Sequence, residues 1–310
     1  RGVCQMNDAR PDPLISASDL LEALDDPNVR IADVRYFPGE PERGRLEYDQ
    51  GHIPGAVFVD MDKDLAARDD RLEFLRAASR YGSERQGAGA EPMPDPDVFA
   101  RHMGGLGFGD EHMIVIHDAA SGQFGARMWA MLDRLGHPNA RVLDGGIAAW
   151  RKAGGPWTTK VRAPEHATMV LATEWPGTND RKRLAEMHGR VDLIDVRAPD
   201  AYSGADATAG TIGGHIPGAR NCPCDSMVAE DGRLKPPAEL LPLIRGEGER
   251  AKLPLVVSCD GGVNACFAAL VARVAGLADP LIYSGSFSDW SSAGMPIAQG
   301  SALEGPIVNG

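Results

Sequence analysis

The stretch Gly51-His52-Ile53-Pro54-Gly55-Ala56 is followed much later in the chain by an identical copy at residues 214–219. Each copy follows an Asp-Val-Arg triplet, Asp33–Arg35 in the first half and Asp195–Arg197 in the second. The aspartate precedes the histidine by 19 positions in the first copy and by 20 in the second. A six-residue identity at nearly the same offset indicates a tandem duplication, so matching positions in the two halves can be compared.

This comparison isolates one cysteine. The apolar strand 113–117 is followed by Asp118, whereas the matching strand 255–258 is followed by Cys259. A tryptophan comes 32 positions after the aspartate and 31 positions after the cysteine, which confirms the alignment of the two halves. Two copies that differ in a reactive side chain predict one working site and one scaffold domain.

The bulk composition is that of a globular protein with an acidic surface. A length of 310 residues favours two domains, and the content is 43% hydrophobic and 25% charged. The net charge of −12 opposes binding to nucleic acid or to anionic membranes. Five cysteines without scaffold spacing, and an N-terminus without an apolar signal core, predict reduced thiols and a cytoplasmic location. Neither a metal site nor another cofactor is expected, because Cys-x2-Cys and His-x3-His spacings are absent from the sequence.

The hydrophobic pattern predicts an α/β fold, with two mostly parallel sheets that carry helices on both faces. We place the domains at residues 6–153 and 169–300, with a linker at 151–168. The first half is longer by 22 positions, which fall in residues 62–94 and form either a surface excursion or a flap over the neighbouring site. The expected strands are 29–34, 56–59, 113–117, 141–143, 191–196, 220–221, 255–258 and 280–283, and the expected helices are 16–24, 96–106, 125–136, 237–245 and 264–275.

The segment after Cys259 has the composition of a tight anion-binding loop. Two glycines, Gly261 and Gly262, follow where the backbone must curl, and a helix is expected to begin near Asn264 as N-cap and to end at Gly276. Backbone N–H groups at the positive end of a helix would then surround the sulfur. That setting predicts a lowered thiol pKa and affinity for negative charge.

These residues carry a family resemblance. The paired Asp-Val-Arg and Gly-His-Ile-Pro-Gly-Ala motifs, together with Cys-x-x-Gly-Val-x-Ala at Cys259, resemble the two-domain rhodanese-type sulfurtransferases that use thiosulfate or 3-mercaptopyruvate. The resemblance implies two rhodanese-like domains, of which the N-terminal one is catalytically silent. It implies that Cys259 takes a sulfane sulfur from a small donor, becomes a persulfide, and passes the sulfur to cyanide or a thiol, a thioredoxin-like protein being one candidate acceptor.

The loop is expected to stabilise the thiolate and the persulfide. His52 matches a histidine of the relay proposed for mercaptopyruvate enzymes, and His52 and Arg197 are therefore candidate supporting residues, although Arg197 is expected to be a structural ion-pair partner. A turn-stabilising role is the alternative for His52. The loop residues that we expect to supply backbone N–H groups are Asp260, Gly261, Gly262, Val263, Asn264 and Ala265.

The sequence departs from the family at the donor site. Asp260 stands where rhodaneses proper carry positive charge, and the family's two substrate-binding arginines fall on Ala201 and Gly210. The donor therefore stays open, and so does a rival function, a sulfur-relay or regulatory module that binds anions or a partner's persulfide with little turnover.

Other reactive groups have competing explanations. Cys222 and Cys224 are expected to be packed thiols, with a redox or resolving pair as the alternative. Cys266 is expected to lie in the core, and Arg127 to pair with Asp118 on the same domain. A phosphatase of the Cys-x5-Arg type is excluded because Ala265 occupies the arginine position.

Overall fold

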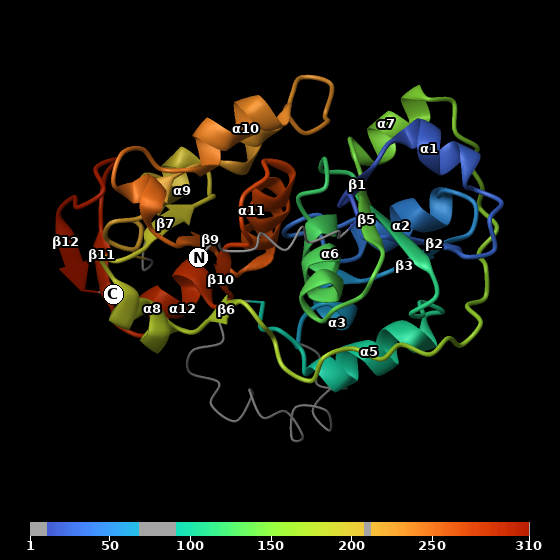
Figure 1. Ribbon diagram of the computed structural model, residues 1–310, viewed down its shortest axis with the longest axis horizontal. Coiled ribbons are helices and arrows are strands. Elements are labelled where there is room, and N and C mark those ends of the chain that lie inside the picture. Colours follow the sequence, from blue (N-terminus) through green and yellow to red (C-terminus); the bar gives the residue numbers. More distant parts are fainter. Residues whose placement is uncertain (1–10, 68–90, 208–211, 310) are drawn as a thin grey trace, which may run out of the picture.

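The computed structural model describes residues 11–67, 91–207 and 212–309. Two α/β units lie side by side in Figure 1, the first in blue to green and the second in yellow to red. Each unit is built on a parallel sheet of five strands. The predicted fold class is therefore confirmed, and the two units repeat each other strand for strand.

The two sheets share one strand order. The first runs β1 (Leu14–Ile15), β5 (Ala140–Leu143), β4 (Met113–His117), β2 (Val29–Asp33) and β3 (Ala56–Phe58). The second runs β6 (Thr178–Asn179), β10 (Leu281–Tyr283), β9 (Leu255–Ser258), β7 (Asp192–Asp195) and β8 (Arg220–Asn221). A separate antiparallel pair joins β11 (Pro296–Ala298) to β12 (Ile307–Asn309).

Helices cover both faces of each sheet. The first domain carries α1 (Ala17–Glu22), α2 (Arg43–Gln50), α3 (Met61–Asp64), α5 (Pro96–Gly105), α6 (Gly125–Arg134) and α7 (Gly146–Lys152). The second carries α8 (Arg181–Met187), α9 (Pro199–Ser203), α10 (Pro237–Ile244), α11 (Val263–Val274) and α12 (Ser286–Ser292), with 3₁₀ turns at Cys224–Met227 and Arg250–Lys252.

The strands are apolar on both sides because both faces are buried. In β4, Ile114 and Ile116 join one core cluster and Val115 joins another on the opposite face. The first of these clusters runs without a break across both domains. Its centre is the contact between α6 and α11, which face each other in the middle of Figure 1. The two domains are thus joined by a shared apolar core.

Within each domain, the Asp-Val-Arg motif and the Gly-His-Ile-Pro-Gly-Ala motif are held together by one ion-pair clamp. In the first domain the Arg35 guanidinium binds the Asp33 carboxylate and donates to the Gly51 carbonyl at 2.9 Å. In the second, Arg197 binds Asp195 and the Gly214 carbonyl in the same way, at 2.8 Å to the carbonyl. The fixed offset between the motifs is therefore explained by a buried ion pair that ties the strand end to the turn.

The histidine of each turn stacks on a tyrosine. The His52 ring lies 4.0 Å from the Tyr48 ring and His215 lies 3.7 Å from Tyr202, both nearly parallel. Each ring also contacts the carbonyl of its tyrosine through Nδ1. This repeated geometry supports the turn-stabilising explanation of both histidines.

Two local expectations need correction. Helix α11 begins at Val263 rather than near Asn264, and its N-cap is Gly262, which has a φ of 91° and makes no side-chain cap. Glycine adopts this left-handed conformation without strain, so the turn closes before Asn264 is reached. In addition, Thr158 of the expected linker pairs with His52, so this part of the segment packs onto the first domain.

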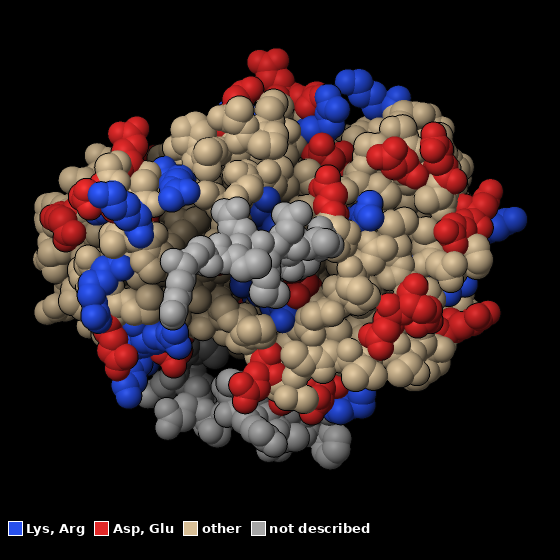
Figure 2. All heavy atoms as spheres, in the orientation of Figure 1, with Lys and Arg blue, Asp and Glu red and all other residues tan. Residues whose placement is uncertain are grey.

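Surface and interior agree with an acidic globular protein. On the face shown in Figure 2, acidic and basic side chains are interspersed along the rims of both domains. Within the described part of the chain, no helix is long and apolar enough to cross a membrane. Most of the predicted excursion at 62–94 lies outside the described residues, so its two interpretations stay predictions.

Candidate active site

Cys259 lies at the carboxyl end of β9, the central strand of the second sheet, and is only 3% exposed. Its Sγ accepts a hydrogen bond from the Gly262 N–H at 3.0 Å and a further one from the Ala265 N–H. Both donors belong to the turn that opens α11. Of the six loop residues that were expected to donate, Gly262 and Ala265 are the ones with a described N–H bond to the sulfur. Gly262 has a φ of 91°, which this turn requires and glycine adopts without strain.

The first domain contains the same loop around a carboxylate. One Asp118 oxygen accepts from the N–H groups of Ala120 and Gly122, both at 2.8 Å, and the other from Phe124 and Gly125, at 2.8 and 2.7 Å. Asp118 is fully buried. The loop of the first domain thus surrounds a buried carboxyl group with four N–H donors, an arrangement suited to binding an anion.

Burial dominates the titration of the cysteine. It raises the pKa of the Cys259 thiol, and the hydrogen bonds from Ala265, Ser286 and Gly262 oppose this rise, whereas the nearby Asp260 carboxylate adds to it. The expectation that the loop alone lowers this pKa is therefore wrong, since the donors offset the desolvation only in part.

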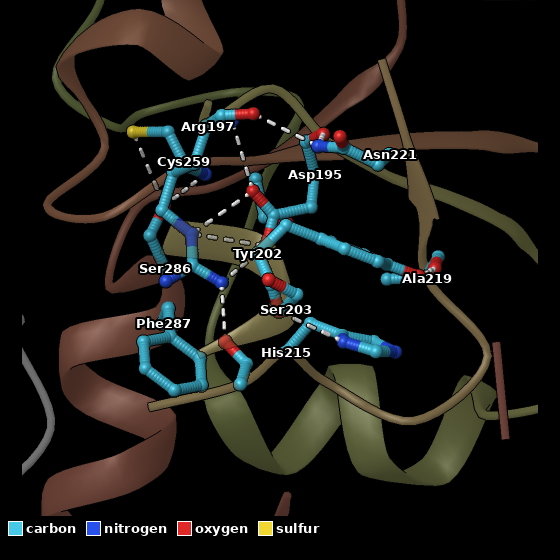
Figure 3. Close-up of polar contacts among 12 residues, drawn as sticks. Asp195, Arg197, Tyr202, Ser203, His215, Ala219, Asn221, Cys259, Ser286 and Phe287 are labelled. Carbon is cyan, nitrogen blue, oxygen red and sulfur yellow. Dashed lines mark hydrogen bonds and ion pairs between the residues drawn. The ribbon is translucent and has the colours of Figure 1, made fainter. Parts of the chain in front are cut away.

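Ser286 is a functional candidate that the motif search did not find. It has a φ of 53°, an unfavourable conformation for a residue with a side chain, and its oxygen lies 3.8 Å from Cys259 Sγ. The hydroxyl accepts from the Cys259 N–H at 3.0 Å (Figure 3). Its one proton can go either to the Tyr283 carbonyl at 2.9 Å or to Cys259 Sγ at 3.8 Å. Gly146 occupies the same place in the first domain with a φ of 54°, so comparison of the repeats could have found the serine.

Arg197 and Asp260 are charged residues close to Cys259. As expected, Arg197 is ion-paired with Asp195, and its guanidinium lies 4.1 Å from the Phe287 ring centroid, below Cys259 in Figure 3. Burial lowers the pKa of Arg197, but its ion pair with Asp195 and, more weakly, the nearby Asp260 and Cys259 raise this pKa above its ordinary value. Asp260 is exposed. The Arg197 guanidinium is therefore already engaged by the Asp195 carboxylate.

His52 belongs to the other domain's turn. It is fully buried, and its described ring contacts are with the carbonyls of Tyr48 and Lys160. Hydrogen bonds connect the loop residues Gly262 and Ala265 with Cys259, but none described connects His52 with this loop. The geometry favours a structural role for His52.

The remaining described thiols are packed. Cys222, Cys224 and Cys266 are each at most 4% exposed, and burial raises the pKa of all three. Cys222 donates to the Leu243 carbonyl at 3.2 Å. These surroundings favour the packing explanation over a redox pair.

The fold and the cysteine loop define a rhodanese-like protein, and comparison with known families agrees. The family model "Rhodanese-like domain" matches residues 16–153 and 180–293, so the chain belongs to this family. Its tandem domains and its relatives place it among the sulfurtransferases, as an enzyme of the thiosulfate or 3-mercaptopyruvate type.

Individual relatives cover nearly the whole chain. The "Probable 3-mercaptopyruvate sulfurtransferase" of Pseudomonas aeruginosa is 30% identical over 303 residues, which are 93% of this chain and 98% of the relative. The thiosulfate sulfurtransferase of Bos taurus is 31% identical over 271 residues, 85% of each chain. Among solved structures, the 3-mercaptopyruvate sulfotransferase SseA from Escherichia coli aligns with a TM-score of 0.71 at 26% identity and covers 90% of this chain and 100% of its own.

Asp118 is predicted to stabilise the silent loop without taking part in sulfur chemistry. Asp118→Ala should lower the free energy of unfolding by roughly 2–4 kcal/mol, because four buried N–H groups lose a charged acceptor. Asp118→Asn, which keeps the shape of the side chain, should lower the free energy of unfolding by a smaller amount. Urea unfolding measures the effect, and intact-mass analysis should show undiminished sulfur loading of the folded variants. A folded Asp118→Ala protein that cannot be loaded would give the first domain a catalytic group.

Ser286 is predicted to favour reaction at Cys259 at the expense of backbone strain. Ser286→Gly should slow sulfur loading roughly three- to tenfold, a loss of about one hydrogen bond, while stability changes little because relief of strain offsets the lost contacts. Ser286→Ala keeps the strain and should be both slow and less stable. Stopped-flow loading and thermal unfolding of the three proteins provide the comparison, and equal loading rates in all three would refute the assignment.

Proposed function

We propose that Cys259 carries sulfur as a persulfide and transfers it from a small donor to a thiol or cyanide. The observation that carries this proposal is the match between the two loops. The first holds two carboxylate oxygens of Asp118 with four N–H groups. In the second the single Cys259 sulfur accepts from Gly262 and Ala265, and an outer persulfide sulfur would occupy the region that corresponds to the second oxygen.

The reaction proceeds in two displacement steps. In the first, the Cys259 thiolate attacks the sulfane sulfur of the donor, so that an S–S bond forms at the cysteine. The donor's own bond to that sulfur breaks, which releases sulfite from thiosulfate, or the enolate of pyruvate from 3-mercaptopyruvate; the enolate then takes a proton from solvent. In the second, an acceptor thiolate or cyanide attacks the outer sulfur and the Cys259 thiolate leaves.

The charges of Asp260 and Arg197 beside Cys259 favour the donor with the lower negative charge. Thiosulfate is a dianion, and exposed Asp260 repels it while Arg197 is engaged by Asp195. One of the two positions where the family carries substrate-binding arginines is Ala201, in α9, and the other, Gly210, lies outside the described residues. We therefore propose 3-mercaptopyruvate, with its single carboxylate, as the better donor of the two.

The persulfide assignment is tested by mass. After donor treatment, the full chain should gain the mass of one sulfur atom, and cyanide should remove it. Cys259→Ser should acquire no sulfur and should lose turnover with every donor, whereas Cys222→Ser should behave as the wild type. Retention of the adduct in Cys259→Ser would locate the sulfur elsewhere.

A charge reversal at position 260 tests the preference between the two donors. Asp260→Arg should raise kcat/KM for thiosulfate roughly three- to tenfold, mainly through KM, because repulsion becomes attraction at an exposed site where salt screens the charges. The gain should shrink at high salt, and the change for 3-mercaptopyruvate should be smaller. Strong preference of the wild type for thiosulfate, with no gain in the variant, would contradict the electrostatic argument.

The rival function is separated by turnover. An enzyme should turn over many times with 3-mercaptopyruvate or thiosulfate when a reduced thioredoxin-like dithiol protein or cyanide accepts the sulfur. A relay or regulatory module should load once and stop. Exposed Asp260 is the feature that favours the rival, and the complete cysteine loop favours the enzyme.

A further inference from the structure

Arg127 reaches from the first domain to the loop of the second. It lies on α6 and its side chain is fully buried. One guanidinium nitrogen donates to the Gly262 carbonyl at 3.4 Å, and another donates to the carbonyls of Leu65 and Glu91 at 3.3 and 3.0 Å. The same group donates to the Cys266 sulfur, one turn into α11. The expected pairing of Arg127 with Asp118 is wrong, because backbone N–H groups fill the Asp118 oxygens and the arginine points across the interface.

The charge of Arg127 is buried beside the cysteine loop. None of the hydrogen bonds that the structure describes for this guanidinium ends on a carboxylate; carbonyl oxygens and one thiol accept them. Carbonyls satisfy the N–H groups but leave the positive charge in place. A negative charge that forms in the neighbouring loop therefore meets a buried cation in a medium where water screens little.

The duplication provides an internal comparison. Gly122 and Gly262 are the glycines whose N–H groups donate to Asp118 and Cys259, and five residues after each come Arg127 and Phe267. The Phe267 ring lies 4.0 Å from the point where a side chain on Gly122 would begin. An apolar ring thus faces the loop whose N–H groups bind a carboxylate, and a cation faces the loop whose N–H groups bind a thiol.

We infer that Arg127 is a positioning residue for Cys259, supplied to the active-site loop by the catalytically silent domain. It holds the carbonyl of the residue whose N–H donates to Sγ, and its charge favours the thiolate and the persulfide over the neutral thiol. This inference rests on the proposed function, since it gives the first domain an electrostatic role in that reaction.

The test measures ionisation of Cys259 without any donor. The full chain is alkylated with iodoacetamide across a pH series, and the modified Cys259 peptide is quantified by mass spectrometry. In Arg127→Met the midpoint of the rate profile should rise by about one pH unit, which is a tenfold loss of thiolate at pH values below it. The midpoint for Arg127→Lys should lie between those of the wild type and Arg127→Met, because lysine keeps the charge but lacks the planar guanidinium.

Arg134 offers a matched control on the same helix. It also crosses the interface, where it donates to the Pro280 carbonyl at 2.7 Å, away from the cysteine loop. Arg134→Met should lower the melting temperature and leave the midpoint of the Cys259 profile unchanged. An Arg127→Met protein with lowered melting temperature and an unchanged midpoint would show that Arg127 is merely structural.

Two further arrangements keep the inference open to refutation. If Arg127→Met does not fold, Arg127→Gln, which retains a donor for the Gly262 carbonyl without the charge, is measured in the same way and should show the same direction of shift. The alkylation profile does not depend on sulfur transfer. A wild-type chain that never acquires sulfur would refute the proposed function, and an unshifted profile would refute the role of Arg127 alone.

Discussion

A turn of backbone N–H groups at the end of a central parallel strand is the constraint on which the rest of this structure depends. In both domains the chain leaves the strand, curls through a positive-φ glycine and enters a helix, so that several N–H groups point at one place. Such a turn cannot be left empty in a protein interior without an acceptor for its donors. The acceptor is the carboxylate of Asp118 in the first domain and the sulfur of Cys259 in the second.

The two acceptors differ in how much further negative charge their loops can stabilise. The carboxylate of Asp118 is fully buried, and four short hydrogen bonds from N–H groups of its own loop satisfy both of its oxygens. A thiol accepts fewer bonds and carries no charge at rest, so its loop keeps unused capacity for negative charge. That capacity is what the proposed sulfur transfer needs, because in both proposed displacement steps charge would move onto and off the Cys259 sulfur. The ion-pair clamps of Arg35 and Arg197 hold the strand ends beneath the two loops.

The sequence was sufficient for the architecture, and it placed Cys259 correctly at the end of a central strand. The duplicated motifs, the alternation of strands and helices, and the exchange of aspartate for cysteine predicted the paired sheets and Cys259, since these depend on local patterns. Contacts across the interface were not predictable, because no local pattern reports which way Arg127 points from a buried helix. The start of α11 was also missed, since a left-handed glycine cap competes with an ordinary asparagine cap. The strained Ser286 left a usable signal, the glycine at the same place in the other repeat.

The most direct test of this account is a high-resolution crystal structure of the protein after treatment with 3-mercaptopyruvate. The account predicts one additional sulfur bonded to Cys259 Sγ and lying among the N–H groups of the loop that opens α11, in the position that corresponds to the second oxygen of Asp118, with the silent loop unchanged. Additional sulfur on Cys222, Cys224 or Cys266, or a Cys259 persulfide that points away from the loop into solvent, would contradict it.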